Sequence, residues 1–238
     1  MKILILTLWC LVPVGLLAYH YGPGRELVTL DATALTLSEA QAKAGAEDWK
    51  AAIAAYEQSL AQLPKDRIDE ARRIRLELAK ARMESDELPK AREELAALAD
   101  ELAQDPQAHA GLRDEALATL ATSRYYMTYL MKLEGLPDTE WEPEIEAARQ
   151  ERKLLVQRAT EAGDSAAAAL HADDLESAIR LARMEPEELY GKAIPKQCSN
   201  CQSGKCANPG DKPGKKPGQK PKDSRGAGAG APVDGEGS

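Results

Sequence analysis

Three cysteines near the C-terminus have the spacing of a metal site or of a redox-active group. Cys198 and Cys201 form a C-x2-C pair, and Cys206 follows five residues later. Thiolates at this spacing can bind one zinc ion, and Cys206 would supply a third of the four ligands that zinc requires. The pattern lacks a fourth ligand, because the nearest later candidate is Asp211 and no His follows Asn200. Three interpretations stay open: zinc binding, disulfide chemistry, or cysteines without a role.

Outside this cysteine group, the sequence carries no motif for catalysis. The histidines, His20, His109 and His171, are far apart, and none stands in a metal-binding or nucleophile-activating pattern. His171 lies three residues before Asp174, which is typical of neighbours on a solvated helix face. A phosphate-binding glycine loop and an H-E-x-x-H motif are also absent. We therefore expect a protein that is not an enzyme and needs no cofactor, with zinc at the cysteines as the alternative.

Composition indicates a helical chain with an acidic body. Of the 238 residues, 43% are hydrophobic and 29% are charged, while aromatic residues make up 4% and Phe is absent. A chain rich in Ala, Leu, Glu and Arg favours helix over strand. The formal charge is −8, but the residues from Lys196 onward carry eight Lys or Arg against four Asp or Glu, so the preceding part carries −12. This acidic body argues against nucleic acid as a partner.

Residues 3–19 form an uncharged, hydrophobic segment directly after Lys2. As a helix, this segment would be about 25 Å long, near the short end of what spans a bilayer. A cleaved signal peptide is the alternative, but the residues up to Ala18 lack the small-x-small pattern of a cleavage site. We therefore predict a single-pass transmembrane anchor, with Lys2 inside and the body on the extracytoplasmic or periplasmic side of the membrane.

After the break at Gly22-Pro-Gly24, helical patterning continues to about Met184. Apolar residues recur in steps of three and four, and no stretch alternates with the two-residue period of a strand. Asp31 is a candidate N-cap, while Pro64 and Pro106 end helices. The predicted helices span about 31–44, 48–64, 68–85, 88–105, 110–133, 143–162 and 164–184. We expect an all-α fold in which these helices pair as antiparallel hairpins.

The stretch from Asp48 to Pro64 has the clearest pattern of a helix that packs against another helix. Large and small apolar residues fall on one face of this helix, and a proline closes it. The second predicted pair repeats the arrangement. The residues that carry it are Leu37, Ser38, Trp49, Ala52, Tyr56 and Pro64 in the first pair, and Leu78, Ala79, Leu88, Ala91 and Leu95 in the second.

The pattern over residues 34–106 resembles two tetratricopeptide repeats (TPRs). It departs from the family in two places. The first turn is about two residues longer than in a TPR, and Asp86 stands where the family has Gly. The resemblance implies a solenoid of helical hairpins that binds a protein partner in its groove and performs no catalysis. An ordinary array of helical hairpins is the alternative, because short helical repeats are easily mimicked.

A third, longer pair contains the densest aromatic cluster of the body, Tyr125, Tyr126 and Tyr129. We expect these tyrosines either to contact the partner on a concave face or to belong to the core and its edge. In the same helix, the residues expected to face inward are Leu117, Leu120, Ala121, Met127 and Leu130. Trp141 is expected to cover the end of this hairpin.

The sequence thus divides into an anchor or signal peptide (1–25), a TPR-like domain (26–192) and a tail (193–238) that contains the cysteines. From Ala207 the tail is rich in Pro, Gly and Lys and has no apolar face, so we expect it to be disordered. The function expected from this organisation is that of a non-catalytic, membrane-anchored scaffold or adaptor for a protein partner. A metal- or redox-active module at the three cysteines and a purely structural envelope spacer are the alternatives.

Overall fold

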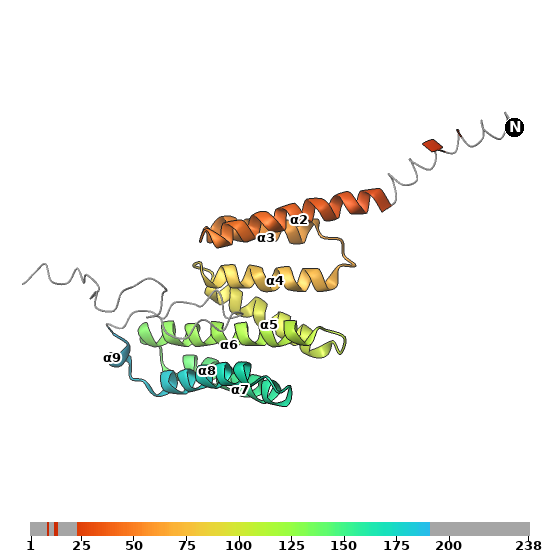
Figure 1. Cartoon of the computed structure of the whole chain (residues 1–238). Helices are drawn as coiled ribbons and strands as arrows, with labels where there is room; N and C mark the ends of the chain where they lie inside the picture. The colour runs from red at the N-terminus through yellow and green to blue at the C-terminus, as the bar shows by residue number, and fades with distance from the viewer. Residues whose placement is uncertain (1–8, 10–11, 14–22, 191–238) are drawn as a thin grey trace, which may run out of the picture. The chain divides into compact units, whose positions relative to one another are not determined.

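The computed structural model describes residues 9, 12–13 and 23–190, and in this part of the chain the regular structure is entirely helical (Figure 1). From α2 to α8, each helix packs against the next one in sequence. The bounds are α2 Pro23–Gly45, α3 Trp49–Gln62, α4 Ile68–Met83, α5 Leu88–Gln104, α6 Ala110–Leu133, α7 Asp138–Glu161, α8 Ser165–Arg183 and α9 Pro186–Leu189. The predicted all-α fold of antiparallel helical hairpins is confirmed for these residues.

The helices of the first hairpin, α2 and α3, pack together through small side chains. Asp48 is the N-cap of α3 and accepts a hydrogen bond from the amide of Ala51 at 3.3 Å. Glu47, in the turn before it, has a φ of 60°, which lies in the left-handed region. The buried apolar residues of this hairpin and of the adjoining face of α4, here called the first cluster, are Ala40, Ala52, Ile53, Ala55, Tyr56, Ile74, Leu78 and Ala81. Half of them are alanine, which lets the helix backbones approach closely.

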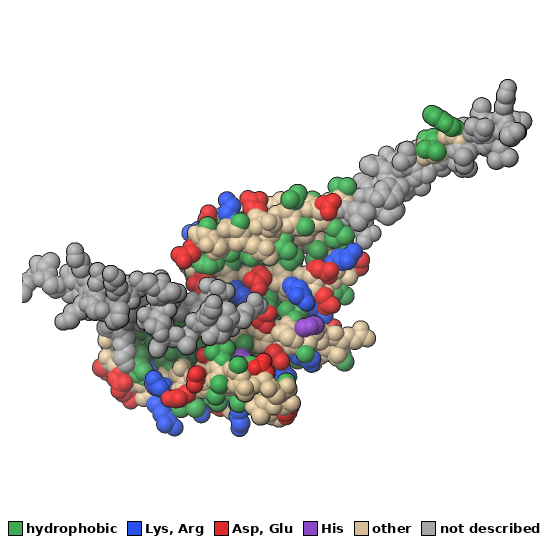
Figure 2. All heavy atoms as spheres, viewed as in Figure 1, with side chains coloured by type: hydrophobic (Ala, Val, Ile, Leu, Met, Phe, Trp, Pro, Cys, Tyr) green, Lys and Arg blue, Asp and Glu red, His purple; other side chains and the backbone are tan. Residues whose placement is uncertain are grey.

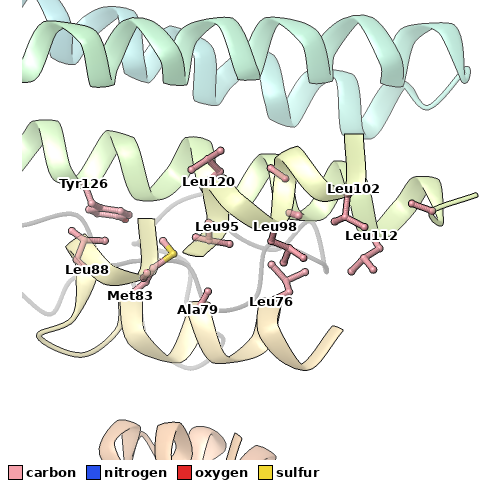
Figure 3. Close-up of a cluster of buried hydrophobic side chains, with 14 residues drawn as sticks. Leu76, Ala79, Met83, Leu88, Leu95, Leu98, Leu102, Leu112, Leu120 and Tyr126 are labelled. Carbon is pink, nitrogen blue, oxygen red and sulfur yellow. The ribbon is translucent and has the colours of Figure 1, made fainter. Parts of the chain in front are cut away.

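The second hairpin, α4 and α5, packs with α6 around a leucine-rich core. Figure 3 shows side chains from these three helices meeting between α4 and α6. In α5 the buried apolar residues follow steps of three and four from Leu88 to Leu102, as the spacing predicts. The residues of this central cluster are Leu76, Ala79, Met83, Leu88, Ala91, Leu95, Leu98, Ala99, Leu102, Ala108, Leu112, Ala116, Leu120 and Tyr126.

A third cluster joins α6, α7, α8 and the short α9. It is made of Tyr129, Trp141, Ile145, Ala178, Leu181 and Leu189. The ammonium of the buried Lys132 lies 3.7 Å from the centre of the Trp141 ring and donates a hydrogen bond of 3.4 Å to the carbonyl of Ala182. Burial lowers the pKa of Lys132. Trp141 is thus covered on one face by a cation from the end of α6.

Two predicted helix starts are wrong. α2 begins at Pro23, so Asp31 lies inside the helix and is not its N-cap. Proline is compatible with a first helical turn because the amides there have no partner within the helix. α7 begins at Asp138 and includes Trp141 and Pro143. Pro143 removes only the bond to the carbonyl of Thr139, one turn from the helix start, while Asp138 favours this start through the helix dipole.

Other details of the described helices also differ from expectation. The short helix α9 was not predicted. Leu130, expected to face inward, is 37% exposed, whereas Leu120 and Ala121 are buried as predicted. Leu117 and Met127 are half-buried. At the C-terminal end of α6 the buried positions belong instead to Thr128, Tyr129 and Lys132.

The segment predicted to be an anchor and the cysteine-containing tail lie outside the described residues, apart from positions 9 and 12–13. No helix within the described ranges is both long enough and apolar enough to span a membrane. The chain divides into two units, residues 1–199 and 200–238, and the helices α2–α9 all belong to the first.

Candidate partner-binding surface

The three tyrosines of α6 differ in exposure. Tyr126 belongs to the central cluster and is 8% exposed, while Tyr129 belongs to the third cluster and is 4% exposed. Tyr125 is half-buried between the two clusters and packs edge-on against Tyr126, with 5.6 Å between ring centroids. Contact between these residues and a partner stays a prediction. Of the three, only Tyr125 offers a substantial surface for such a contact.

The residues expected to pack the first two hairpins lie mostly between helices. In the first pair, Ala52 and Tyr56 are buried, and Leu37 and Trp49 pack at the edge of the first cluster. Pro64 is half-buried just after α3. Ser38 differs, because it lies on an exposed face of α2, and Ala40 is the buried small residue of this helix. In the second pair, the buried residues are Leu78, Ala79, Leu88, Ala91 and Leu95.

Two arginines of α4 form ion pairs with carboxylates of the neighbouring helices. Arg82 of α4 is only 3% exposed and binds Glu57 of α3 and Glu94 of α5, together with Glu87 at 3.2 Å. At the other end of α4, Arg72 binds Glu101 and Asp105, each at 2.7 Å. These contacts connect α4 to both of its neighbours in sequence. The sequence showed these residues only as charged helix faces.

A second group of ion pairs joins α5, α6 and α7. Arg124 of α6 binds two carboxylates of α7, Glu144 at 2.8 Å and Glu151 at 3.0 Å. Glu144 also binds Arg92 of α5. The second oxygen of Glu151, Oε2, is buried and has no hydrogen-bond partner. Figure 2 shows acidic and basic side chains interleaved with hydrophobic ones over the face in view.

Next to this group lies a pocket of about 170 Å³ that is lined by residues of α5, α6 and α7. Its apolar lining includes Leu154, which is 39% exposed. Arg113 at its edge binds no carboxylate among the described residues, and Arg158 binds Asp114 at 2.7 Å. The lining residues are Ala96, Ala99, Asp100, Ala103, Arg113, Leu117, Leu120, Arg124, Glu151, Leu154 and Arg158.

Glu151 gives this pocket an unusual titratable group. Burial raises the pKa of Glu151 to about 7, and this effect outweighs the favourable charge of Arg124. Arg152 also favours the ionised form, while Glu144 disfavours it. Burial thus opposes ionisation of Glu151, and the ion pair with Arg124 favours it.

Sequence reasoning missed this pocket, although its residues follow a readable pattern. Arg113, Leu117, Leu120 and Arg124 occur in steps of four, three and four, which places them on one face of α6. This face carries an arginine at each end of an apolar centre. Leu117 and Leu120 are expected from the sequence to face inward, and the sequence alone does not show that the space beside them is partly open between α5 and α7.

The cysteines expected to hold zinc or to form a disulfide lie outside the described residues, so their role stays a prediction. Within the described ranges, no group of three or more His, Cys, Asp or Glu is arranged to hold a metal ion.

Comparison with known proteins supports the repeat interpretation. Residues 43–115 match the family model of the tetratricopeptide repeat. The match begins in the last turn of α2, covers α3, α4 and α5, and ends in the first turns of α6. No curated protein and no solved structure matches the chain. The matched residues form consecutive packed helices, so this part of the chain is similar to tetratricopeptide repeats both in sequence and in its helical arrangement.

Proposed function

We propose that this protein is a non-catalytic scaffold that is held at a membrane by residues 3–19 and binds a protein partner through its helical repeats. The observation that carries the binding function is the match of residues 43–115 to the tetratricopeptide repeat. Such repeats generally mediate protein–protein interactions and are typically not catalytic. Stacked helical repeats present extended surfaces that suit this task.

The anchoring part of the proposal rests on the sequence. Residues 3–19 contain no charged side chain, and Lys2 precedes them. A helix of this length is near the short end of what crosses a hydrocarbon core, and a positive charge before it favours retention of the N-terminus inside. The helical body would then lie on the extracytoplasmic side, where the anchor keeps a bound partner close to the membrane surface.

Membrane extraction tests the anchor. The full chain is expected to remain with the membranes during washing with alkaline carbonate. Replacing Leu6 and Val12 by Glu places two charges inside the segment, each costing about 2.5–3.5 kcal/mol at the centre of a membrane helix, so this variant is expected in the soluble fraction. Equal extraction of both chains by carbonate would contradict the anchor.

Crosslinking in intact membranes tests the scaffold. Purification of the full chain after crosslinking is expected to enrich one protein in near-stoichiometric amount. Tyr125→Ala tests the aromatic contact, because this side chain is partly exposed and its loss disturbs the core less than loss of Tyr126 or Tyr129. Failure to enrich any protein above an unrelated membrane-anchored control would remove the scaffold function and leave a structural spacer.

A further inference from the structure

Arg152 of α7 joins three helices through polar contacts. Its Nη1 lies 3.2 Å from Nδ1 of His171 and 3.0 Å from Oδ2 of Asp174, both on α8. Its Nη2 donates a hydrogen bond of 2.6 Å to the hydroxyl of Thr122 on α6. Arg152 is 8% exposed, and His171, which the sequence places on a solvated helix face, is half-buried. These four residues are here called the Arg152 junction.

The contact with Arg152 fixes the protonation state of His171. An arginine side chain carries only donors, so Nδ1 of His171 accepts and the proton of the neutral ring is on Nε2. Protonation of the ring turns this acceptor into a donor and places two cations 3.2 Å apart. Neutral His171 therefore joins α8 to α7, whereas its imidazolium is repelled by Arg152.

The other charged groups around His171 are carboxylates. Burial, followed by the charge of Arg152, lowers the pKa of His171 from its ordinary value. Three carboxylates oppose this shift, those of Asp174 on α8, Asp114 on α6 and Asp164 before α8. Asp174 and Asp114 already form ion pairs with arginines of α7, and Asp164 is the N-cap of α8. The imidazolium would compete with Arg152 for Asp174, its neighbour three residues along the same helix.

The half of α8 that carries the Arg152 junction buries little else. The buried residues of α8, Ala178 and Leu181, lie in its C-terminal half. Among residues 165–177, every side chain is half-buried or exposed. Segments with few buried apolar contacts open at low cost in free energy. The contacts with Arg152 therefore contribute a large share of what attaches the N-terminal half of α8 to α7.

We propose that the Arg152 junction is a pH-sensitive switch, in which protonation of His171 breaks its bond with Arg152 and releases the N-terminal half of α8 from α7. In the released state the ring is solvated and has its ordinary pKa of 6.5. The pKa in the closed state is lower, so the released state binds the proton more tightly and the closed state loses stability as the pH falls below 6.5. The switch is independent of the scaffold function proposed above.

A titration of the full chain in detergent tests the switch. NMR of the chain labelled with ¹³C-histidine gives the pKa of His171, assigned by the signal that is lost in His171→Gln. Hydrogen exchange of residues 165–177 is followed by mass spectrometry from pH 7.5 to 4.5, with exchange times scaled for the pH dependence of the chemical step. Exchange there is expected to accelerate in acid by up to about tenfold for each unit by which the measured pKa lies below 6.5. Helices α3 and α5 should keep their protection.

Three variants separate protonation of His171 from a general effect of acid. Glutamine offers Arg152 an acceptor oxygen but does not titrate, so His171→Gln is expected to keep α8 closed throughout the titration. His109→Gln, at an exposed position before α6, is the matched control and should open like the unaltered chain. Asp174→Asn removes a carboxylate that favours the imidazolium, so the pKa of His171 and the pH of opening should both move downward.

Several results would overturn the switch. Unchanged protection of residues 165–177 across the titration would show that α8 does not open. Equal opening in His171→Gln and the unaltered chain would assign the acid sensitivity to other groups. A pH of opening that does not follow the measured pKa of His171 in Asp174→Asn would separate opening from protonation. Loss of protection in α3 and α5 together with α8 would indicate unfolding of the whole helical array.

Discussion

The first cluster and the central cluster share one helix, α4, but they are packed differently. The first cluster is half alanine and contains no leucine other than Leu78, whereas the central cluster is dominated by leucines from α4, α5 and α6. In α4, Ile74, Leu78 and Ala81 face the first cluster, and Leu76, Ala79 and Met83 face the central one. α4 thus has two apolar faces, and each of them packs into a different cluster.

The difference shows how two similar helix pairs reach stability by different routes. Close backbone approach around small residues leaves no room for added volume. A leucine-rich core depends instead on the apolar area that it buries, at roughly 25 cal/mol per Å². The two clusters should therefore respond in opposite ways to removal and addition of side-chain volume.

Removal of a leucine from the central cluster should have the largest effect. Leu95 is 0% exposed, so Leu95→Ala is expected to lower the free energy of unfolding by about 3 kcal/mol through lost burial and a residual cavity. Chemical denaturation followed by circular dichroism measures this loss. Leu154→Ala is the matched control, because Leu154 is 39% exposed and its truncation should cost far less. Equal losses in the two variants would contradict a tightly packed central cluster.

Added volume in the first cluster should come next. Ala52 of α3 is fully buried in the first cluster, so Ala52→Leu is expected to cost about 2 kcal/mol by overpacking. The exposed Ala54 on the same helix provides the control, and Ala54→Leu should change stability by less than about 0.5 kcal/mol. A stabilised Ala52→Leu variant would show that the hairpin holds unfilled space, and the contrast between the clusters would then disappear.

The ion pairs of Arg82 connect the two clusters and should contribute less. Removing one member of a buried pair costs about 3–5 kcal/mol when the remaining charge stays buried. Here the carboxylate partners Glu57 and Glu94 are about 50% and 39% exposed, so water can solvate them after Arg82→Met, and the expected loss is about 1 kcal/mol. Arg73→Met, at an exposed position of α4, is the control. A loss above about 3 kcal/mol would show that the carboxylates cannot be solvated.

The smallest effect should be a change in pH dependence at the turns of the first two hairpins. Burial, assisted by Glu47, raises the pKa of Glu84 to about 7, above its ordinary value of 4.5. Between these two values the folded state holds a proton that the unfolded state releases, so this residue makes the fold less stable as the pH rises from 4.5 to 7. Glu84→Gln should therefore raise the melting temperature at pH 8 and have little effect at pH 4.5. Glu39→Gln, at an exposed position, should show no such difference.

Much of this helical architecture could be predicted from the sequence, because its apolar residues keep one period over long stretches. The predicted bounds of α6, Ala110 to Leu133, agree with the structure. The errors lie where proline is compatible with the first turns of a helix, at Pro23 and Pro143. Proline is expected to end a helix, but a proline within the first turns of a helix does not interrupt it.

The candidate site was harder to predict, because it depends on how three helices meet. Tyr125 and Tyr126 are adjacent in sequence, yet Tyr126 enters the central cluster and Tyr125 stays partly exposed. Likewise, the arginine at 113 and the one at 124 lie on the same face of α6, but only Arg124 reaches carboxylates of α7. The position of the neighbouring helices decides which of the two arginines forms an ion pair. The residue pattern of α6 alone does not show this.

Two of the three tryptophans, Trp49 and Trp141, can report on the helical array by their fluorescence. Trp49 packs at the edge of the first cluster, and Trp141 lies in the third cluster beneath Lys132. The central cluster contains no tryptophan. Emission from single-tryptophan chains would therefore follow the two ends of the stack separately during unfolding. Coincident transitions would mean that the solenoid melts as one unit, and separated ones that the leucine core holds after one end has opened.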